Sequence, residues 1–323
     1  MNVETKILSE LTEDGYSSGE AISEKLSISR SAVWKHIVKL RGRGYIINAS
    51  PRHGYRLAGR PDKLLPAELA PLLKTSILGG HIVHLEETPS TSDAARKLVG
   101  EGAPEGTVVF AESQTDGRGR LGRGWHSPPG KTIAMSVILY PSLPPTRTPL
   151  LSLATALAVK RAVEETTSAR VALKWPNDIY LSGRKLAGVL VEMAAEIDRV
   201  KWVIDSVGIN VNNSFAGTEL EGRATSLADE LGREISRREL AVALLTHLEK
   251  IYNKAQSASG LVAIRRSFRK HDLLQGRQIE VKTPDGVISG TADGIDFEGR
   301  LLVRDHAGKV QSLFSGEATI TKR

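Results

Sequence analysis

The sequence contains no cysteine, which excludes disulfide bonds, thiolate metal sites and a cysteine nucleophile. No stretch of about 18 uncharged apolar residues is present, so a transmembrane helix is not expected. The best apolar run, Leu150 to Val159, leads directly into Lys160 and Arg161. The first ten residues are polar and acidic and do not resemble a signal peptide. Together these absences predict a cytoplasmic protein without a membrane partner.

The composition is that of an ordinary soluble protein, with 40% hydrophobic and 25% charged residues. A length of 323 residues exceeds what one hydrophobic core usually supports, so two or three domains are expected. The formal net charge of +7 permits a nucleic-acid partner without establishing one.

Residues 1 to about 60 read as a small helical domain. A predicted helix ends before Ser27-Ile28-Ser29, and a second begins there with apolar residues one turn apart at Val33, Ile37 and Leu40. Two short helices so joined are typical of a helix-turn-helix motif. Two β-like runs, 45–48 and 55–57, flank the turn Pro51-Arg52-His53-Gly54 and predict a wing.

The charge of this region indicates its partner. Nine Lys or Arg and no Asp or Glu lie between Lys25 and Arg60, whereas a merely solvated face would mix signs. Such a stretch favours binding to DNA phosphates. A winged helix used for protein contacts is the weaker alternative, and Trp34 is predicted to pack rather than to contact bases. The predicted DNA-contacting residues are Arg30, Ser31, Lys35, Lys39 and Arg52.

The most informative stretch is residues 114–130, where glycine recurs at 117, 119, 122 and 124 and arginine at 118, 120 and 123. The glycines disfavour a helix or strand interior. The guanidiniums suit phosphate, and Trp125 offers a ring for stacking. A disordered RNA-binding repeat is less favoured, because apolar strands flank the segment. The spacing matches neither a P-loop nor a dinucleotide fingerprint.

A predicted β-hairpin spanning 171–192 carries a second polar cluster. Asp178 can hold a divalent cation that bridges nucleotide phosphates, although the local sequence alone favours a simple Asn-Asp turn. Lys185 opens an otherwise apolar strand, so it must reach solvent or meet an anion. Asn177 and Asn210 are weaker candidates for nucleotide contacts, because each could be a turn or strand-end residue.

The strand and helix pattern predicts an α+β fold. Hairpins with segregated helices indicate a central mixed β-sheet. After about residue 275 the pattern changes to short strands and glycine turns, expected at 278–282, 286–293, 300–304 and 309–314. This region is predicted to be a small SH3-like β-barrel that acts as a structural lid and contributes no catalytic cluster.

Residues 117–125, Gly-Arg-Gly-Arg-x-Gly-Arg-x-Trp, resemble the adenylate-binding loop of biotin protein ligases. Other segments resemble the family in the same order along the chain, and the sequence departs at Ser92, where the family usually has Asn. With its N-terminal region, nearly the whole chain resembles the ligases that also repress the biotin operon. The matching segments are Ser90-Thr91, 174–178, 185–188, 208–210 and 223–228.

The resemblance implies a winged helix-turn-helix domain at 1–60, a catalytic domain like that of class II aminoacyl-tRNA synthetases at 66–272, and the SH3-like domain at 275–323. It implies formation of biotinyl-5'-AMP from biotin and ATP with Mg²⁺. Biotin then passes to a lysine of the biotin carboxyl carrier protein of acetyl-CoA carboxylase. It also implies operator DNA and a ligand-promoted homodimer as partners.

The resemblance also assigns roles to residues. Those expected to bind biotin are Ser90, Thr91, Gln114, Gly117, Arg118, Gly119, Arg120 and Lys185. Those expected to bind ATP or the adenylate are Arg120, Arg123, Trp125, Asn177 and Asn210. Catalysis is expected from Lys185, Arg118, Arg120 and Asp178, with Mg²⁺ on Asp178. Helix capping alone is the alternative for Ser90 and Thr91.

Two other functions compete with this interpretation. Octanoyl transfer on a related fold uses a cysteine nucleophile, which this chain lacks, and lipoate ligases lack both the glycine-arginine loop and the winged helix. A transcription regulator that only senses a ligand is disfavoured by the combination of the loop, Asp178 and Lys185.

Overall fold

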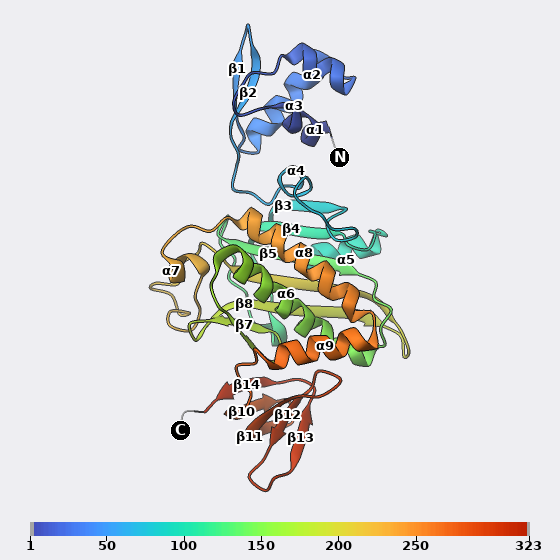
Figure 1. The fold of residues 1–323 in the computed structure, drawn as a ribbon, viewed down its shortest axis with the longest axis vertical. Helices are drawn as coiled ribbons and strands as arrows, with labels where there is room; N and C mark the ends of the chain where they lie inside the picture. The colour runs from blue at the N-terminus through green and yellow to red at the C-terminus, as the bar shows by residue number, and fades with distance from the viewer. Residues whose placement is uncertain (1–2, 322–323) are drawn as a thin grey trace. The chain divides into compact units, whose positions relative to one another are not determined.

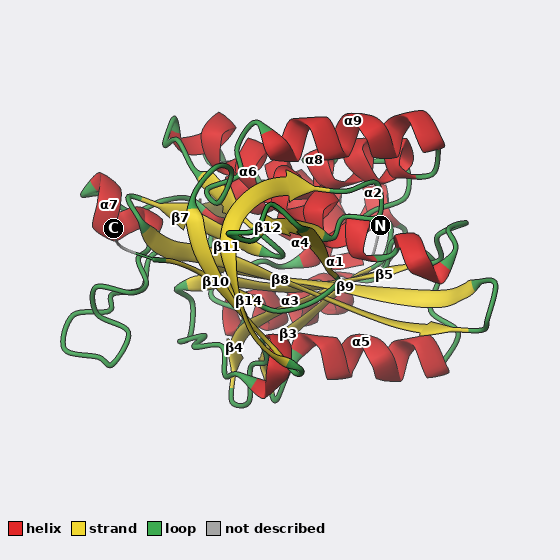
Figure 2. Ribbon diagram, turned by 90° about the horizontal axis from the view of Figure 1, so that it is seen from below, coloured by secondary structure: helices red, strands yellow, loops and turns green. Residues whose placement is uncertain are grey.

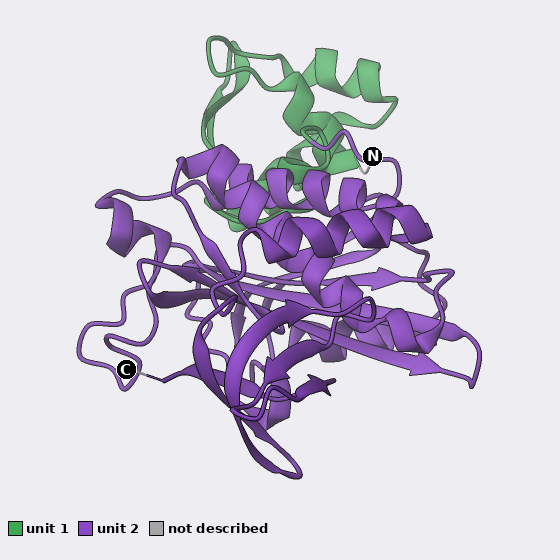
Figure 3. Cartoon of the chain, turned by 60° about the horizontal axis from the view of Figure 1, so that its bottom comes forward, with its two compact units in different colours: residues 1–72 green, residues 73–323 purple. Residues whose placement is uncertain are grey.

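The computed structural model describes residues 3–321. The chain divides into two compact units, residues 1–72 and residues 73–323 (Figure 3). Within the described residues, no helix is both long and apolar enough to cross a membrane.

The first unit is a winged helix-turn-helix, as predicted. Ser18 and Ser29 cap the second and third helices, their hydroxyls accepting hydrogen bonds from the backbone N–H groups of Ala21 and Ala32. Ser27, in the left-handed conformation with φ 53°, ends the second helix and makes the turn. The elements are α1 (Val3–Glu10), α2 (Gly19–Leu26), α3 (Arg30–Gly42), β1 (Ile46–Ser50), β2 (Gly54–Gly59) and α4 (Pro66–Leu69).

The core of this unit collects the apolar stripes of its helices. Val33, Ile37 and Leu40 of α3 are fully buried, as their spacing predicted. Leu65 and Ala67 join the same core, which is why the unit extends past residue 60 to include α4. The division into domains at 1–60, 66–272 and 275–323 stays a prediction.

The second unit is built on a seven-stranded sheet of order β3-β4-β5-β9-β8-β7-β6. Only β3 and β4 pair in parallel and the other neighbours are antiparallel, so the sheet is mixed, as predicted. The strands are β3 (Ile82–Thr88), β4 (Val108–Gln114), β5 (Thr132–Leu139), β6 (Ala172–Lys174), β7 (Asp178–Leu181), β8 (Arg184–Ala195) and β9 (Val200–Asn210).

Helices cover both faces of this sheet, which explains why every residue of β5 is buried. Figure 2 shows α5 on one side of the strands and α8 and α9 on the other, and Figure 1 shows α6 beside α8. The face that carries α5 also carries the candidate site. The helices are α5 (Thr91–Gly100), α6 (Pro149–Thr167), α7 (Leu227–Leu231), α8 (Arg237–Ala255) and α9 (Ala258–Arg269).

The C-terminal region is an all-antiparallel β domain with strand order β13-β12-β11-β10-β14. Four of its strands were predicted, and the fifth, β14, was not. The hydrogen bond from Trp175 Nε1 to the Gly299 carbonyl, 2.9 Å long, joins this domain to the central sheet. The strands are β10 (Gln278–Thr283), β11 (Gly286–Ile295), β12 (Leu301–Arg304), β13 (Val310–Leu313) and β14 (Glu317–Ile320).

Candidate active site

A cavity of about 800 Å³ lies on the α5 face of the sheet, and the glycine-arginine loop and β14 form part of its wall. Nearly all the residues predicted to bind biotin or nucleotide line it, although they come from distant segments of the chain. Gly117, at the start of the loop, is the exception, because it does not line the cavity. The predicted residues that line the cavity are Ser90, Thr91, Gln114, Arg118, Gly119, Arg120, Arg123, Trp125, Asn177, Asp178, Lys185 and Asn210.

The loop folds back on itself as a narrow hairpin. The N–H of Trp125 donates to the Gly117 carbonyl and that of Gly119 to the Arg123 carbonyl, each at 2.7 Å. Leu121 and Gly122, both at positive φ, turn the chain between them. A Cβ at Gly117 would lie 2.5 Å from the Trp125 carbonyl oxygen, so only glycine allows this close approach.

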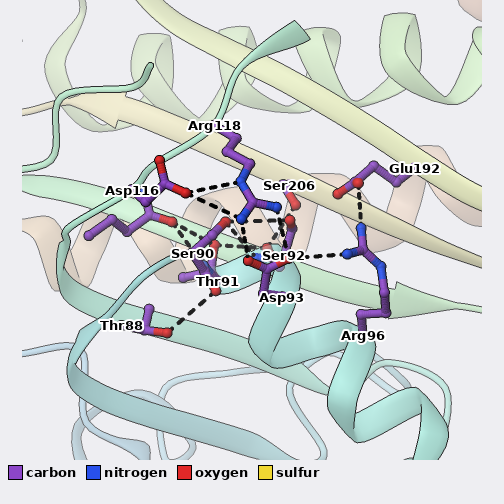
Figure 4. A network of polar contacts seen from close by, with 12 residues as sticks. Thr88, Ser90, Thr91, Ser92, Asp93, Arg96, Asp116, Arg118, Glu192 and Ser206 are labelled. Atoms are coloured by element: carbon purple, nitrogen blue, oxygen red, sulfur yellow. Dashed lines mark hydrogen bonds and ion pairs between the residues drawn. The ribbon is translucent and has the colours of Figure 1, made fainter. Parts of the chain in front are cut away.

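A network of polar side chains forms one wall of the cavity (Figure 4). The Gln114 Oε1 accepts hydrogen bonds from the Thr91 N–H, at 2.9 Å, and from the Thr91 hydroxyl, at 3.2 Å. The Ser136 hydroxyl donates to Thr91 Oγ1 and pairs with Ser206. Because the Gln114 carbonyl is taken up in this way, its amide Nε2 is the group left to donate to a ligand. Ser90 acts as the N-cap of α5, the role that local sequence alone predicted.

Arg118 is held at the cavity rim by carboxylates. Its guanidinium lies 2.8 Å from an oxygen of Asp93 on α5 and 3.3 Å from Asp116 in the loop (Figure 4). The hydrogen bond to Asp116, followed by the charge of Asp93, raises the pKa of Arg118. These contacts fix the start of the loop against α5.

Arg123 fixes the other side of the loop. Both of its terminal nitrogens contact the carboxylate of Glu317 on β14, one of them at 2.6 Å. The hydrogen bond from Arg123 is the main cause that lowers the pKa of Glu317. The unpredicted strand β14 therefore brings the C-terminal domain into the cavity wall. No sequence signal pointed to Glu317, because its partner is 194 residues away.

Lys185 and Asp178 lie together, as the hairpin pattern suggested they could. The Lys185 Nζ is 2.6 Å from Asp178 Oδ1 and 5.8 Å from the centroid of the Trp125 ring. Of the two environments expected for Lys185, solvent or an anion, the ammonium group meets an anion, the Asp178 carboxylate.

Two further cations lie in the cavity without a carboxylate of residues 3–321 in ion-pair contact. The Arg120 guanidinium bonds the Asn177 side-chain oxygen at 3.4 Å, and the Lys174 ammonium bonds the Tyr180 hydroxyl at 3.3 Å. Burial is the largest influence on each and lowers both pKa values, with the charge of Asp178 opposing it. Partly buried cations without a counter-ion are costly, so this cavity is suited to an anion. Lys174 was not predicted as a site residue, although it lies within a matching segment.

The two asparagines are partly committed to the fold. The Asn177 Nδ2 donates to the Val189 carbonyl at 2.6 Å, and the Asn210 Oδ1 accepts from Asn213 at 3.3 Å. Each therefore combines the structural role considered for it with a position on the cavity wall.

The donor set suits a magnesium ion only if the ion arrives with its substrate. No group of three or more metal-binding side chains occurs within residues 3–321. Asp178 is a single carboxylate, and one of its oxygens is already paired with Lys185. Magnesium in nucleotide sites commonly uses one or two carboxylates together with phosphate oxygens, which this arrangement allows.

The first unit presents its predicted DNA-contacting residues to solvent. Lys35 and Lys39 on α3 and Arg52 in the wing are exposed, with no ion pair to any described residue. Arg30 is also exposed but lies 3.4 Å from Glu20. The Ser31 hydroxyl pairs with the hydroxyl of Ser29, the N-cap of α3, at 2.9 Å.

The prediction that Trp34 packs in the core is wrong. Its side chain is 56% exposed, because the buried stripe of α3 runs through Val33, Ile37 and Leu40. Trp34 and Val38 lie one turn apart beside that stripe, on the surface of the helix.

Comparison with known proteins agrees with this geometry. The sequence model of the biotin/lipoate A/B protein ligase family matches residues 85–212. An HTH domain matches residues 3–56, and the biotin protein ligase C-terminal domain matches residues 275–319.

Two curated relatives align with almost the whole chain. The chain is 41% identical over 303 residues to the bifunctional ligase/repressor BirA of Bacillus subtilis (strain 168), covering 93% of this chain and 92% of that one. It is 30% identical to the protein of the same name from Escherichia coli (strain K12), covering 98% and 97%. The biotin protein ligase of Aquifex aeolicus, solved in complex with biotin and ATP, superposes with a TM-score of 0.66 at 28% identity, covering 76% of this chain and all of that one.

Identity along almost the whole chain, the three matching regions and a cavity lined by the loop therefore agree, and the protein belongs to the family of biotin protein ligases that carry an N-terminal helix-turn-helix repressor domain.

Proposed function

We propose that the cavity joins biotin to ATP, forming biotinyl-5'-AMP, and then passes the biotinyl group to a lysine of an acceptor protein. The observation that carries this proposal is the pair of uncompensated cations, Arg120 and Lys174, beside the Lys185–Asp178 pair. Three cations around one carboxylate leave an excess of positive charge for two anionic substrates.

In the first step the biotin carboxylate attacks the α-phosphorus of ATP and pyrophosphate leaves. The chain's own part is to hold two anions together and to neutralise the charge that builds up between them. Lys185 is placed for the reacting carboxylate, and Arg120 and Lys174 for phosphate oxygens. Mg²⁺, which Asp178 would help to hold, supplies further charge neutralisation when it enters with ATP.

The polar network and the loop position the substrates. We assign the amide of Gln114, the Thr91 hydroxyl and the loop backbone to biotin, and Trp125, Asn177 and Asn210 to the nucleotide. Arg118 and Arg123 act by holding the loop closed through Asp93 and Glu317. A closed loop excludes water, which would otherwise hydrolyse the mixed anhydride.

In the second step the lysine amine of the acceptor attacks the acyl carbon and AMP leaves. The amine must lose a proton, and Asp178 is our candidate for the group that accepts it. We propose the biotin carboxyl carrier protein of acetyl-CoA carboxylase as the acceptor. The relative from Mycobacterium tuberculosis, a biotin--[acetyl-CoA-carboxylase] ligase that is 35% identical, supports this choice.

The first unit adds regulation. We propose that it binds operator DNA through the exposed side chains of α3 and the wing, as a homodimer that forms when the adenylate is bound. A dimer suits a helix-turn-helix protein, because two recognition helices then read two half-sites. The cytoplasmic location stays a prediction from the sequence.

One experiment tests the chemistry directly. The purified protein is incubated with α-labelled ATP and either biotin or lipoate, and the labelled adenylate is separated by chromatography. We expect an adenylate with biotin and little with lipoate. Adenylate with lipoate alone would reassign the substrate, and none with either would leave the chain as a ligand-sensing regulator.

A further inference from the structure

Two glycines face each other on neighbouring central strands beneath the loop. Gly188 of β8 and Gly208 of β9 are register partners in the antiparallel ladder. Both line the cavity, and the Trp125 ring lies against both. The contacts are unequal, however, because the indole lies much closer to Gly208 than to Gly188.

A side chain at Gly208 would collide with the indole. An added Cβ would lie 2.5 Å from Trp125 Nε1 and 2.7 Å from Cζ2, closer than real Cβ contacts come. The ring cannot yield easily, because a rigid indole has no flexible end to move aside. An added Cβ at Gly188 would instead lie 3.5 Å from the Trp125 Cζ3 and from the Lys185 side chain, an ordinary van der Waals contact.

The backbone at Gly208 does not itself require glycine. It lies within a regular strand, and its φ is outside the left-handed region that other residues avoid. A glycine in a strand interior weakens the strand unless a close approach requires it. Here the close approach is that of the indole.

We propose that Gly208 is a positioning residue that receives the Trp125 indole and so docks the glycine-arginine loop on the central sheet. The proposal rests on the function proposed above, since the docked loop is the wall that retains biotin and the adenylate. The Trp125 Nε1 is buried without an acceptor among the described residues. The indole is therefore held by the fit of its shape rather than by a hydrogen bond.

Docking the ring fixes more than one side chain. The Trp125 N–H bonds the Gly117 carbonyl, so the ring and the start of the hairpin that carries Arg118, Arg120 and Arg123 move together. The ring also lies beside Lys185. A displaced indole is expected to withdraw the arginines from the cavity and to loosen the position of Lys185.

The test compares Gly208→Ala with Gly188→Ala, the same added methyl on facing residues. For Gly208→Ala we expect biotinyl-AMP to be released about tenfold faster or more, because the added methyl overpacks the site where the indole docks. The release rate is measured by chase with unlabelled ligand. Gly188→Ala should have a much smaller effect. Equal effects of the two substitutions would overturn the proposal.

A double variant separates docking from damage to the strand. If Gly208 acts through Trp125, then Gly208→Ala combined with Trp125→Ala should release the adenylate no faster than Trp125→Ala alone. Additive losses would show that Gly208 acts through the sheet and would overturn the proposal. If Gly208→Ala alone fails to fold, recovery of folding in the double variant supports the collision, and no recovery contradicts it.

A ligand-free measurement keeps this inference distinct from the proposed chemistry. Trypsin cleaves after arginine, and the loop contains three. Without any ligand, Gly208→Ala should be cut faster within residues 118–123 than Gly188→Ala, because a released loop is more accessible. Equal cutting rates for the two variants would contradict the docking role, even if the wild-type protein forms biotinyl-AMP. Failure of the wild-type protein to form biotinyl-AMP would contradict the proposed function alone.

Discussion

Most of the cations predicted to meet DNA and most of those predicted for the reaction site are held in opposite ways. Lys35, Lys39 and Arg52 of the first unit are exposed, without an ion pair to any described residue. In the cavity, three of the four predicted cations, Arg118, Arg123 and Lys185, each contact a carboxylate. The fourth, Arg120, has no carboxylate in ion-pair contact among the described residues. The DNA-contacting residues and the loop arginines were predicted from a concentration of basic residues, whereas Lys185 was predicted from its place in an apolar strand and from the family resemblance.

The difference follows from what each region must bind. A DNA backbone is a long polyanion that exchanges counterions for side chains, so the basic residues only need to be accessible. A reaction site must place its charges before the substrate arrives, and neighbouring carboxylates orient them. In the first unit the free cations supply affinity for a polyanion. In the cavity the paired cations are held in position, and the unpaired Arg120 and Lys174 leave positive charge for the substrates.

The strongest test of a paired cation is Lys185→Ala. It removes the ammonium from beside the reacting carboxylate and leaves Asp178 without its partner. We expect biotinyl-AMP formation to fall by roughly 100-fold or more, while the fold remains. The measurement is pyrophosphate release under single-turnover conditions.

The matched control for that variant is Lys201→Ala, on β9 outside the cavity, where the lysine pairs with Glu196 at 3.0 Å. It should retain wild-type activity. Near-normal adenylate synthesis by a folded Lys185→Ala protein would rule out the role given to this lysine.

A buried carboxylate with no cation of the described residues in ion-pair contact extends the comparison to the core. Asp205 of β9 is 1% exposed, and its contact is a hydrogen bond from the Thr155 hydroxyl. Burial raises its pKa from 3.8 to about 7. The folded state therefore keeps a proton that the unfolded state loses, so this group lowers stability as pH rises from about 4 to 7, and the loss is complete above 7.

Replacing the carboxyl by an amide removes that pH dependence. The stability of Asp205→Asn relative to wild type should therefore be greater at pH 8 than at pH 5, by on the order of 2 kcal/mol. Urea unfolding at both pH values measures the difference. A constant difference between the two proteins at both pH values would contradict the raised pKa.

The free cations are tested by the double variant Lys35→Ala/Lys39→Ala. Each phosphate contact contributes about 0.9 to the slope of log affinity against log salt, so the slope should fall by up to about 1.8. Fluorescence anisotropy with a labelled random-sequence duplex measures it over a range of salt concentrations. Lys25→Ala is the control, because Lys25 already pairs with Glu10 at 2.7 Å and should leave the slope nearly unchanged.

The smallest effect is expected for Glu317→Gln, which frees Arg123 from β14. Both side chains are substantially exposed, at 58% and 38%, and such pairs contribute about 1 kcal/mol or less. Release of biotinyl-AMP should quicken by less than about fivefold. The exposed Glu280→Gln on β10 is the control. A loss as large as that of Lys185→Ala would show that β14 takes part in the chemistry itself.

Local sequence by itself determined much of this protein. The serine caps and the apolar spacing of α3 defined the helix-turn-helix, because a helix end and a buried stripe each depend on a few neighbouring residues. The glycine-arginine loop was recognised because its composition excludes regular structure. The mixed sheet followed from the strand and turn pattern.

Only the tertiary structure decided which charges are paired and which ring rests on which strand. Arg123 meets Glu317 across 194 residues, and Trp125 meets Gly208 from another segment of the chain. Trp34 is exposed because the neighbouring residues of α3 take the buried side of the helix. These outcomes depend on the packing of elements that are distant in sequence, and a short-range pattern carries no information about such distances.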